Sequence, residues 1–589
     1  FKAPKSASVL YAVSDDPRVQ GAIIEAGEVA MTAAIGWIER EAIRVRRGSH
    51  NQAWLAAHAD EPGAGPRQLP TSGVVAASFR HRTSRAGDPL LHWHTLVANL
   101  AEGTDGKWSA FTHPDLYRHV RAAGEVFQAV YRTELSHSLG VEWRPGRHVP
   151  EIAGIPQQLL DTFSKRTTEI DAWLAATGTP DTPEGRQEAV LATRRHKREL
   201  EGHRFDEAWK VEAEAAGWGP AEAERLVGWY QARTAPAFDE VWRLEGVVFD
   251  EHGDPEQIER LVDPEEWIEH VLRVDLTSDR STFTEPDLVR AIAARQGHGA
   301  TIETLERIAA RVLSSPLVIS VEAGPDGVQR WTSRELMDVE SQFIRALDAR
   351  GSAAAVPAAQ LASAIAGFGA LGSDQAAAVR AVASADNQLA VLVGPAGTGK
   401  TFTMDAVRTV FETAGWHVHG AAPSARAALE LASGAQVPAS TLHSLLHAWD
   451  RQHDAPTAHS LLIIDEAGMA DIRTLQSVVT RQVAAGGRVL LVGDHHQLPE
   501  VGAGGGFVYA ATHSPTVAEL TVNRRQRHQW EQIALEQLRS GSVARAVDAY
   551  LANDRVVVTE THDEMICGAV DRWFAARAEG LNPVLLAGT

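Results

Sequence analysis

The stretch Leu389-Ala-Val-Leu-Val-Gly-Pro-Ala-Gly-Thr-Gly-Lys-Thr401 decides how the second half of this chain folds. Five apolar residues precede the pattern G-x-x-x-x-G-K-[ST], which forms a phosphate-binding loop between a buried strand and a helix. Its glycines let backbone N–H groups curl around phosphate oxygens, and the positive end of a helix over 400–412 faces the anion. The predicted nucleotide-binding residues of this loop are Gly394, Pro395, Ala396, Gly397, Thr398, Gly399, Lys400 and Thr401. We predict that they bind ATP, with Lys400 on the β- and γ-phosphates and Thr401 on Mg²⁺.

Three further apolar runs alternate with helical stretches around this loop: Val418–Ala422, Leu461–Ile464 and Val489–Val492. This alternation predicts βαβ units and a parallel sheet. One run, Leu461–Ile464, ends at Asp465 and Glu466. A carboxylate at a strand end beside a phosphate loop suits Mg²⁺, so we assign that role to Asp465. Glu466 is placed to accept a proton from the attacking water. The alternative is a strand that ends in a solvated Asp-Glu pair.

Two further candidate residues follow in chain order. Gln497 comes after a second strand that ends in an acidic residue, and it is a candidate sensor of the γ-phosphate or the attacking water. The adjacent His495 and His496 are alternative metal ligands, although neighbouring histidines rarely point at one ion. Arg525 is predicted to neutralise charge on the γ-phosphate from a second domain.

The order of these motifs resembles that of superfamily 1 DNA helicases of the RecD-like group. Leu371–Gln375 looks like the adenine-reading segment of that family, with Gln375 as the reader. Ala421–Ala427 and Thr441–Leu446 look like its segments that contact single-stranded DNA. The resemblance covers about 370–589 and implies DNA unwinding driven by ATP and Mg²⁺.

This resemblance implies a RecA-like P-loop domain over 365–512 and the start of a second RecA-like domain over 513–589. Members of the group carry two further motifs towards the C-terminus, which include another ATP-contacting arginine. Neither motif occurs before Thr589. We therefore expect the second RecA-like domain to be truncated, and ATP hydrolysis by this chain to be impaired.

A second chemical signal lies in Ser78-Phe-Arg-His-Arg-Thr-Ser-Arg-Ala-Gly-Asp-Pro-Leu-Leu-His-Trp-His94. His92 and His94 are two residues apart, which on a strand places both imidazoles on one face. His81 precedes a turn-forming stretch, so it can return to that face from a neighbouring strand. Three imidazoles suit a divalent metal ion, which polarises a phosphate as a Lewis acid. The chain has 25 histidines, so chance clustering is the alternative.

The surroundings of these histidines resemble the TrwC/TraI-type (MobF-like) conjugative relaxase. The resemblance rests on Phe1–Leu10, His81–Arg85, Asp88–His94, Gly106–Trp108, Tyr131–Leu135 and Phe163–Arg166. Such relaxases nick one strand of plasmid DNA at an origin of transfer, through a tyrosine that stays bound to the 5′ end. The resemblance implies that His81, His92 and His94 hold Mg²⁺, Mn²⁺ or Zn²⁺. Asp88 and Asn99 are candidates for supporting them.

The sequence departs from this family at the nucleophile. In the family, the attacking tyrosines and a supporting acidic residue lie ahead of the segment that matches Phe1–Leu10. The six tyrosines of this chain are Tyr11, Tyr117, Tyr131, Tyr230, Tyr509 and Tyr550, and we interpret Tyr11 as a packing residue. We therefore expect a fragment that is cut at both ends and does not cleave DNA covalently.

The expected fold class is multidomain α/β and α+β. It combines a relaxase-type antiparallel sheet with helices, a helical or winged-helix middle region, and a RecA-like parallel sheet with the start of a second. We place the relaxase domain at 1–175, with strands at Val74–Phe79 and Leu96–Leu100 and a helix over 115–139. A helical linker follows at 176–270 and a winged-helix-like module at 271–355. Two predicted helices, Phe283–Gln296 and Ile302–Leu313, and a hairpin around Gly324–Gly327 suggest that module. The basic run Thr193–Leu200 is either a solvated helix face or a phosphate-contacting surface.

The composition excludes some classes of protein but indicates the function less specifically than the motifs do. The chain has 589 residues, 44% of them hydrophobic and 22% charged, which excludes a mainly disordered or collagen-like chain. A net charge of −20 argues against a uniformly basic nucleic-acid binder but not against local basic patches, for example around Arg80, Arg82 and Arg85. One cysteine, Cys567, excludes a disulfide within the chain. We find no long apolar run, so we expect a cytoplasmic protein without a membrane span.

The sequence therefore predicts a relaxase–helicase that acts on single-stranded and origin-of-transfer DNA, with accessory DNA-transfer and coupling proteins as partners. One alternative is a RecD-like DNA-repair helicase whose N-terminal half is a non-catalytic binding module. Another is a non-enzymatic, ATP-dependent scaffold. Glu466 argues against a scaffold, because a scaffold needs no carboxylate to activate water.

Overall fold

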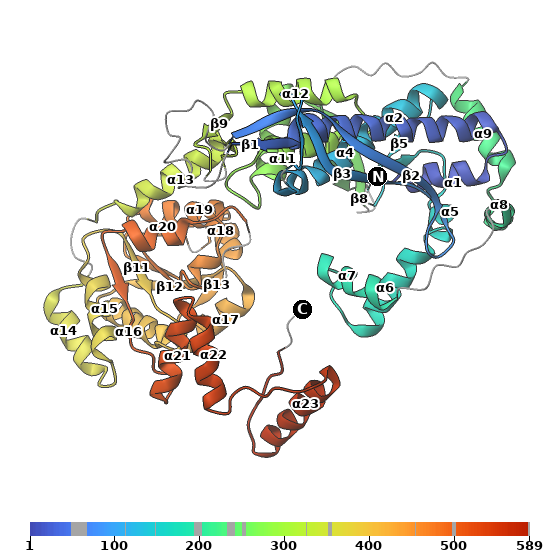
Figure 1. Ribbon diagram of the computed structural model, residues 1–589. Coiled ribbons are helices and arrows are strands. Elements are labelled where there is room, and N and C mark those ends of the chain that lie inside the picture. Colours follow the sequence, from blue (N-terminus) through green and yellow to red (C-terminus); the bar gives the residue numbers. More distant parts are fainter. Residues whose placement is uncertain are drawn as a thin grey trace. The chain divides into compact units, whose positions relative to one another are not determined.

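The computed structural model of the chain forms two compact units (Figure 1). The N-terminal unit consists of Phe1–Leu276 and Phe283–Trp331, and the C-terminal unit of Thr277–Thr282 and Thr332–Gly588. The five domains predicted from the sequence divide the chain more finely than these two units, so those boundaries stay a prediction. The structure describes residues 1–48, 67–111, 113–147, 149–193, 203–231, 242–249, 255–324, 327–351, 356–453, 455–497 and 502–586.

An antiparallel sheet lies at the centre of the N-terminal unit. Its four strands run in the order β1 (Arg44–Arg47), β2 (Arg67–Thr83), β3 (Pro89–Gly103) and β4 (Trp108–Ser109). Phe1–Ala3 pairs with the beginning of β3, because Ala3 N donates to Leu91 O at 2.9 Å. The structure confirms the predicted relaxase-type architecture of an antiparallel sheet with helices.

Three helices cover one face of this sheet: α1 (Lys5–Val13), α2 (Pro17–Ala42) and α4 (His113–Leu139). Leu91 and Trp93 on β3 point into this core and are buried. The Trp93 ring lies 5.8 Å from the ring of Phe127 on α4. Residues that alternate with them on β3 therefore lie on the opposite face of the sheet. Helix α4 confirms the helix predicted over 115–139.

Helix α2 has the length and composition of a membrane span. Its most apolar window has a mean hydropathy of 1.3, and 33% of that window is buried. Ile23, Ala30 and Trp37 of α2 are nevertheless buried in the core of the N-terminal unit. Gly27 of α2 lies so close to Trp93 that an added Cβ would meet the indole ring at 2.0 Å. These contacts are those of a core helix in a globular unit.

The rest of the N-terminal unit is mainly helical. Its elements are β5 (Trp143–Arg144), β6 (Glu151–Ile152), α5 (Gln157–Thr162), α6 (Lys165–Thr177), α7 (Pro183–Ala192), α8 (His203–Ala215), α9 (Pro220–Gln231), β7 (Arg243–Phe249), β8 (Pro255–Leu261), α10 (Pro264–His270) and the π-helix η1 (Val271–Leu276). The basic run that begins at Thr193 lies outside the described residues from 194 onward.

The two helices and the hairpin predicted after residue 280 are present. They are α11 (Glu285–Arg295), α12 (Ile302–Ser314), and the paired strands β9 (Val318–Val321) and β10 (Arg330–Ser333). Phe283 forms an antiparallel bridge with Trp331 ahead of the first of these helices. The winged-helix interpretation of this segment stays a prediction.

A six-stranded parallel sheet organises the C-terminal unit, as the alternating sequence pattern predicted. The strand order is β13 (Ala439–Thr441), β12 (His417–Ala422), β14 (Ser460–Ile464), β15 (Arg488–Gly493), β11 (Leu389–Val393) and β16 (Val517–Glu519). Every residue of β11, β14 and β15 is buried, because helices cover both faces. This is the predicted RecA-like parallel sheet.

The two faces of the sheet hold separate cores. Ala390 and Leu392 of β11 pack with helices α14 (Ala358–Gly367), α15 (Ser373–Ser384), α16 (Lys400–Thr413) and α17 (Ala425–Ala435). Leu389 and Val391 pack on the other face with α13 (Arg334–Leu347), α18 (Leu442–Asp450), α19 (Ile472–Ala484) and α20 (Gly506–His513). Because β11 is held on both faces, the position of its last residue, Val393, is fixed, and so is the start of the phosphate-binding loop that follows.

The chain after residue 513 first completes this sheet and then forms helices. Strand β16 pairs in parallel with β11, so it belongs to the sheet of the phosphate-binding loop. Helices α21 (Gln529–Arg539), α22 (Val543–Ala552) and α23 (His562–Ala578) follow. The interpretation of 513–589 as the start of a second RecA-like domain stays a prediction.

Candidate nucleotide and metal sites

The phosphate-binding loop connects β11 to α16 in the predicted strand–loop–helix order. Gly397 and Gly399 have φ angles of 86° and 87°, which side-chain-bearing residues rarely adopt. Both glycines also face close neighbours. A Cβ on Gly397 would lie 2.7 Å from Cβ of Arg525, and one on Gly399 would lie 2.6 Å from Nε2 of Gln375. The two glycines are thus required by the backbone and by the packing.

The loop is shaped to receive an anion. Thr398 Oγ1 donates to Pro395 O at 2.8 Å, and Lys400 Nζ donates to Gly394 O at 3.0 Å, which holds the loop curled. Helix α16 begins at Lys400, and no side chain caps its first turn. Its first backbone N–H groups therefore suit phosphate oxygens, together with the positive end of the helix dipole. The residues of the loop fit a nucleoside triphosphate.

Two carboxylates end the neighbouring strand β14. Burial, together with repulsion from Glu466, raises the pKa of Asp465 to about 6, and the attraction of Lys400 opposes that rise. Glu466 N donates to Asp465 Oδ1 at 2.9 Å, and Lys400 lies close enough to affect the Asp465 carboxylate. Glu466 has a φ of 50°, an uncommon value for a non-glycine residue and one often found at functional sites. The three residues are the charged set that Mg²⁺ and a phosphate chain require.

Gln375 also lies against the loop. Its side chain is buried, and Oε1 accepts a hydrogen bond from Gly372 N at 3.0 Å, while Nε2 donates to Gly399 O at 3.3 Å. Because Arg525 packs on Gly397, the structure brings Gln375, the loop and Arg525 together. These residues are separated by as much as 150 positions in the chain.

Gln497 lies four residues after β15, the strand that pairs with β11, and this brings it near the phosphate-binding loop. Its Nε2 donates to Asp494 Oδ2 at 3.4 Å. Gly493, the residue before this aspartate, accepts a hydrogen bond from Gly394 N at 3.0 Å. Residues 498–501, which follow Gln497, lie outside the described residues.

Sequence reasoning missed two ion pairs at this site. Arg524 pairs with Asp374, and its Nη1 also donates to Thr398 O at 2.9 Å. Arg539 on α21 donates to Asp494 Oδ1 at 3.2 Å. Arg524 and Asp374 each adjoin a residue that the motifs did single out. Their separation in the chain left no local signal that they pair.

The three histidines meet on the face of the N-terminal sheet that lies opposite α1, α2 and α4. In the register of β2 and β3, His81 lies opposite His92, and Phe79 lies opposite His94. One nitrogen from each ring lies within 4.8 Å of the others. Among the described residues this is the one group of three or more potential metal ligands. The predicted convergence from two strands is present, while the role of the residues as ligands stays a prediction.

The chemistry of His92 suits a metal ion. Its Nδ1 lies 3.0 Å from Leu90 O, so a proton on Nδ1 leaves Nε2 free for a ligand bond. Burial lowers the pKa of His92, with further lowering by His94 and His81, and this favours the neutral, metal-binding form. The three residues therefore fit a divalent cation.

Asp88 has a different environment from the one we expected of a supporting carboxylate. It is buried, and its carboxylate lies 3.6 Å from Nζ of Lys165 at the start of α6. Burial raises the pKa of Asp88, while Lys5 and Lys165 oppose that rise. Asp88 thus connects the beginning of β3 to a segment, Phe163–Arg166, that the sequence analysis had also singled out.

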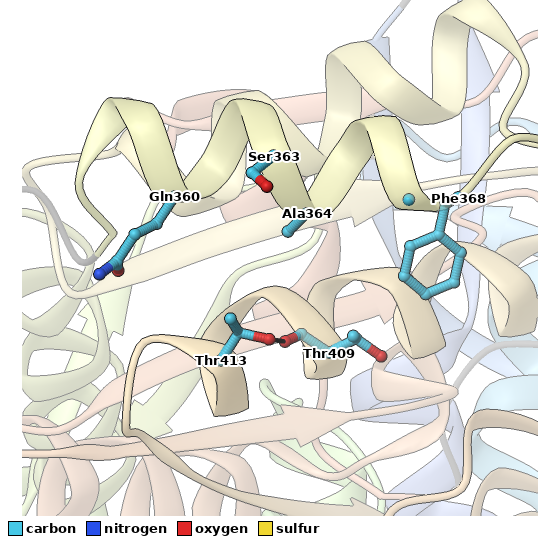
Figure 2. Close-up of a pocket in the computed structure, with 7 residues that line it drawn as sticks. Gln360, Ser363, Ala364, Phe368, Thr409 and Thr413 are labelled. Carbon is cyan, nitrogen blue, oxygen red and sulfur yellow. Dashed lines mark hydrogen bonds between the residues drawn. The ribbon is translucent and has the colours of Figure 1, made fainter.

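A separate pocket of about 420 Å³ lies between α14 and α16 in the C-terminal unit (Figure 2). Figure 2 shows Gln360 and Ala364 of α14 facing Thr409 and Thr413 of α16. These threonines lie in the last turns of α16, whereas the phosphate-binding loop precedes its first turn. The pocket is therefore distinct from the phosphate cradle.

Comparison with known proteins follows the division into two units. Residues 1–216 match the family model described as TrwC relaxase, and residues 370–561 match that of an AAA domain. A probable conjugal transfer protein TraA of Sinorhizobium fredii is 31% identical over 307 residues, which cover 51% of this chain and 27% of that protein. The ATP-dependent RecD2 DNA helicase of Deinococcus radiodurans is 38% identical over 145 residues, which cover 24% of this chain and 20% of that protein.

Among solved structures, the conjugative relaxase TrwC in complex with oriT DNA is 28% identical and has a TM-score of 0.32. That match covers 37% of this chain and 72% of the solved chain. The matched region spans about a quarter of the length of the TraA relatives, 27% in each of the first two.

Proposed function

We propose that this chain, in which a TrwC relaxase domain precedes an AAA domain, works as part of a conjugative DNA-transfer relaxase–helicase. The observation that carries the proposal is the presence of two sites in one chain. The first is the three-histidine cluster, and the second is the phosphate-binding loop with its two carboxylates. The proposed activities are metal-dependent nicking of one DNA strand at a plasmid origin of transfer, and ATP-driven DNA unwinding.

In the N-terminal unit, His81, His92 and His94 are proposed to hold a divalent cation, either Mg²⁺, Mn²⁺ or Zn²⁺. When bound, such an ion polarises the scissile phosphate as a Lewis acid. The hydrogen bond between His92 and Leu90 orients the imidazole, which keeps the ligand nitrogen in place. The sheet face that carries these rings is proposed to receive single-stranded DNA.

We propose that the attacking tyrosine is not among those of the N-terminal unit. Tyr11 is partly buried and packs against the core, which supports its interpretation as a packing residue. Tyr131 and Tyr230 are buried, and their hydroxyls donate to backbone carbonyls at 3.2 and 2.8 Å. Tyr117 lies on α4, the helix that packs on the sheet face opposite the histidines.

In the C-terminal unit, the loop residues 394–401 are proposed to hold the phosphates of ATP, with Mg²⁺ on Thr401 and Asp465. Glu466 is proposed to accept a proton from the attacking water. Gln375 is proposed to read the adenine, and Arg525 to neutralise charge on the γ-phosphate. Gln497 is proposed to sense the γ-phosphate, and its hydrogen bond to Asp494, which directly follows β15, supports that position.

The proposed partners are single-stranded and origin-of-transfer DNA, together with accessory DNA-transfer and coupling proteins in the cytoplasm. The segments Ala421–Ala427 and Thr441–Leu446 are proposed to contact the DNA. They follow the carboxyl ends of β12 and β13, where the loops of a parallel sheet carry its ligands.

A RecD-like DNA-repair helicase with a non-catalytic N-terminal module is the second candidate. The match to the RecD2 helicase favours it. It leaves the three converging histidines and the match of residues 1–216 without a role. The two candidates differ in whether the histidines hold a metal ion.

ATP turnover measured with and without a single-stranded oligonucleotide tests the helicase half of the proposal. We expect the wild-type chain to hydrolyse ATP slowly and the oligonucleotide to raise that low turnover. Glu466→Gln is expected to lower turnover by about 10²–10⁴-fold, as for loss of a general base, while ATP binding is retained. Lys400→Ala is expected to lose ATP binding as well. Turnover that responds neither to DNA nor to Glu466→Gln would contradict the assignment.

A further inference from the structure

The segment Val522–Gln526 lies directly across the phosphate-binding loop. Arg524 N donates to Gly397 O at 2.8 Å. Asn523 Oδ1 accepts hydrogen bonds from the backbone N–H groups of Arg525 and Gln526, at 3.0 and 3.2 Å, which folds the segment into a tight turn. The loop and this segment therefore touch along their backbones.

The side chain of Arg524 extends from this contact to a third part of the site. Its Nη2 donates to Asp374 Oδ1, and its Nη1 lies 3.2 Å from Asp374 Oδ2. The same Nη1 donates to Thr398 O at 2.9 Å. One guanidinium thus binds a carboxylate through both of its oxygens and a carbonyl of the phosphate-binding loop at the same time.

The carboxylate of Asp374 has no free oxygen in this arrangement. Besides Arg524, Oδ1 accepts from Gln375 N at 2.9 Å, and Oδ2 accepts from Val522 N at 3.2 Å. The Asp374 side chain is 10% exposed and that of Arg524 is 29% exposed. Pairs with this bidentate geometry and partial burial are stronger than isolated surface ion pairs. The hydrogen bonds from Arg524 hold the pKa of Asp374 at about 2.

The pair joins the part of the site that is proposed to hold the adenine to the part that is proposed to hold the γ-phosphate. Asp374 immediately precedes Gln375, and Arg524 immediately precedes Arg525. Gly372 is so close that a Cβ there would meet Arg524 Nη2 at 2.0 Å. A displacement of either member of the pair would therefore move a proposed adenine reader or a proposed phosphate ligand.

We propose that Arg524 and Asp374 form a positioning pair of the ATP site. The pair sets the distance between Gln375 and Arg525 across the loop. Gln375 can then contact the base while Arg525 contacts the γ-phosphate of the same nucleotide. Each member is proposed to act through the residue that follows it, Gln375 or Arg525. This inference rests on the proposed ATP-binding function, and it adds the residues through which the site distinguishes adenine from other bases.

The test compares the affinities of the full-length chain for ATP and GTP, measured by competition with a fluorescent ATP analogue. Arg524→Ala and Asp374→Asn are expected to weaken ATP binding about tenfold, the loss expected for one charged hydrogen-bonded pair. GTP binding is expected to weaken less, because a displaced Arg525 affects both nucleotides, whereas a displaced Gln375 affects only ATP. Selectivity for ATP therefore falls, which a general loss of stability would not cause.

Three further variants sharpen the test. In a Gln375→Ala background, Arg524→Ala is expected to cause no further loss of selectivity, because the two residues act on one contact. The exchange Asp374→Arg with Arg524→Asp is expected to recover part of the selectivity that either change alone removes. The matched control is Arg527→Ala, which removes an exposed arginine directly after the segment and is expected to bind both nucleotides like the wild type.

Each outcome separates this inference from the function on which it rests. If Lys400→Ala abolishes ATP binding while Arg524→Ala and Asp374→Asn leave ATP selectivity unchanged, the positioning pair is wrong and the ATP site stands. If Lys400→Ala binds ATP as tightly as the wild type, the proposed ATP site itself is wrong. Thermal unfolding of each variant identifies one that fails to fold, and the conservative Arg524→Lys then replaces Arg524→Ala. It keeps the charge without the bidentate geometry and is expected to lose ATP selectivity as well.

Discussion

Asp465 illustrates how a single buried carboxylate acquires a pH dependence. The protonated form cannot bind Mg²⁺, and the pKa of this group is raised to about 6, mainly by burial. The acid is therefore ionised at neutral pH and becomes protonated as the pH falls through about 6. In the proposed site, removal of that charge weakens the binding of the Mg²⁺ ion that accompanies ATP.

We predict that the affinity for Mg²⁺–ATP is constant from pH 7 to 8 and falls about tenfold for each pH unit below about 6. Asp465→Asn is expected to bind Mg²⁺–ATP weakly and with little pH dependence between pH 5 and 8. Isothermal titration calorimetry over this range provides both measurements. A wild-type affinity that stays constant down to pH 5 would show that Asp465 does not hold the metal ion.

Asp465→Asn is also expected to change the stability of the protein in the absence of nucleotide. An ordinary aspartate titrates near pH 3.9, so the unfolded chain ionises Asp465 before the folded chain does. The folded state therefore loses stability from this group as the pH rises from about 4 to about 6, and the loss remains at higher pH. Asp465→Asn removes it, so we expect a higher melting temperature than that of the wild type at pH 8.

Single functional residues can be predicted from the sequence when the residues that act together are also neighbours in the chain. A phosphate-binding loop is recognisable because its glycines, lysine and threonine must be adjacent to perform their task. Arg524 and Asp374 were not predicted, because an ion pair between residues 150 positions apart leaves no local pattern. The environment of Asp88 was also beyond prediction, since Lys165 is brought beside it by α6.

Among the elements, the pairing of β2 with β3 has the largest consequence for function. The register places His81 opposite His92, and the alternation along β3 places His94 on the same face. Phe79, which lies opposite His94, is 53% exposed and points to this face as well. His94 is thus a candidate metal ligand, and Phe79, its cross-strand partner, is a matched control for substitution.

We predict that His94→Ala lowers the affinity for Mn²⁺ at least about tenfold, because one of three imidazole ligands is lost. Phe79→Ala removes a larger side chain from the same position and is expected to leave the affinity unchanged. Electron paramagnetic resonance of free Mn²⁺ measures both values. Equal affinities for the wild type and His94→Ala would favour the second candidate, a repair helicase with a non-catalytic front half.

Elements were predicted where the apolar pattern is strong. The four buried strands predicted in the C-terminal unit lie within one residue of β11, β12, β14 and β15, because strands covered on both faces read as continuous apolar runs. The segments predicted as Val74–Phe79 and Leu96–Leu100 are only parts of β2 and β3. Their remaining residues mix charged side chains and histidines with apolar ones such as Leu91 and Trp93, so they show no clean alternation, and pairing between the strands extends them.

The whole molecule is acidic, yet its basic residues near the histidines do not form an unopposed positive patch. Arg80 pairs with Glu28 at 3.2 Å, and Arg82 pairs with Asp206 at 3.0 Å. These partners offset part of the local charge that the sequence suggested for DNA binding. If the N-terminal unit binds DNA as proposed, attraction of the DNA backbone depends on the proposed metal ion and on exchange of these ion pairs, neither of which enters a count of charges.

The central claim is that one chain carries two independent sites, one for a metal ion in the N-terminal unit and one for a nucleotide in the C-terminal unit. Native mass spectrometry of the intact chain with Mn²⁺ and ADP counts both ligands at once. We predict that His92→Ala loses one Mn²⁺ and keeps ADP, whereas Lys400→Ala loses ADP and keeps the Mn²⁺ held by the histidines. A His92→Ala chain that retains the same metal count as the wild type would contradict the account, as would a Lys400→Ala chain that still binds ADP.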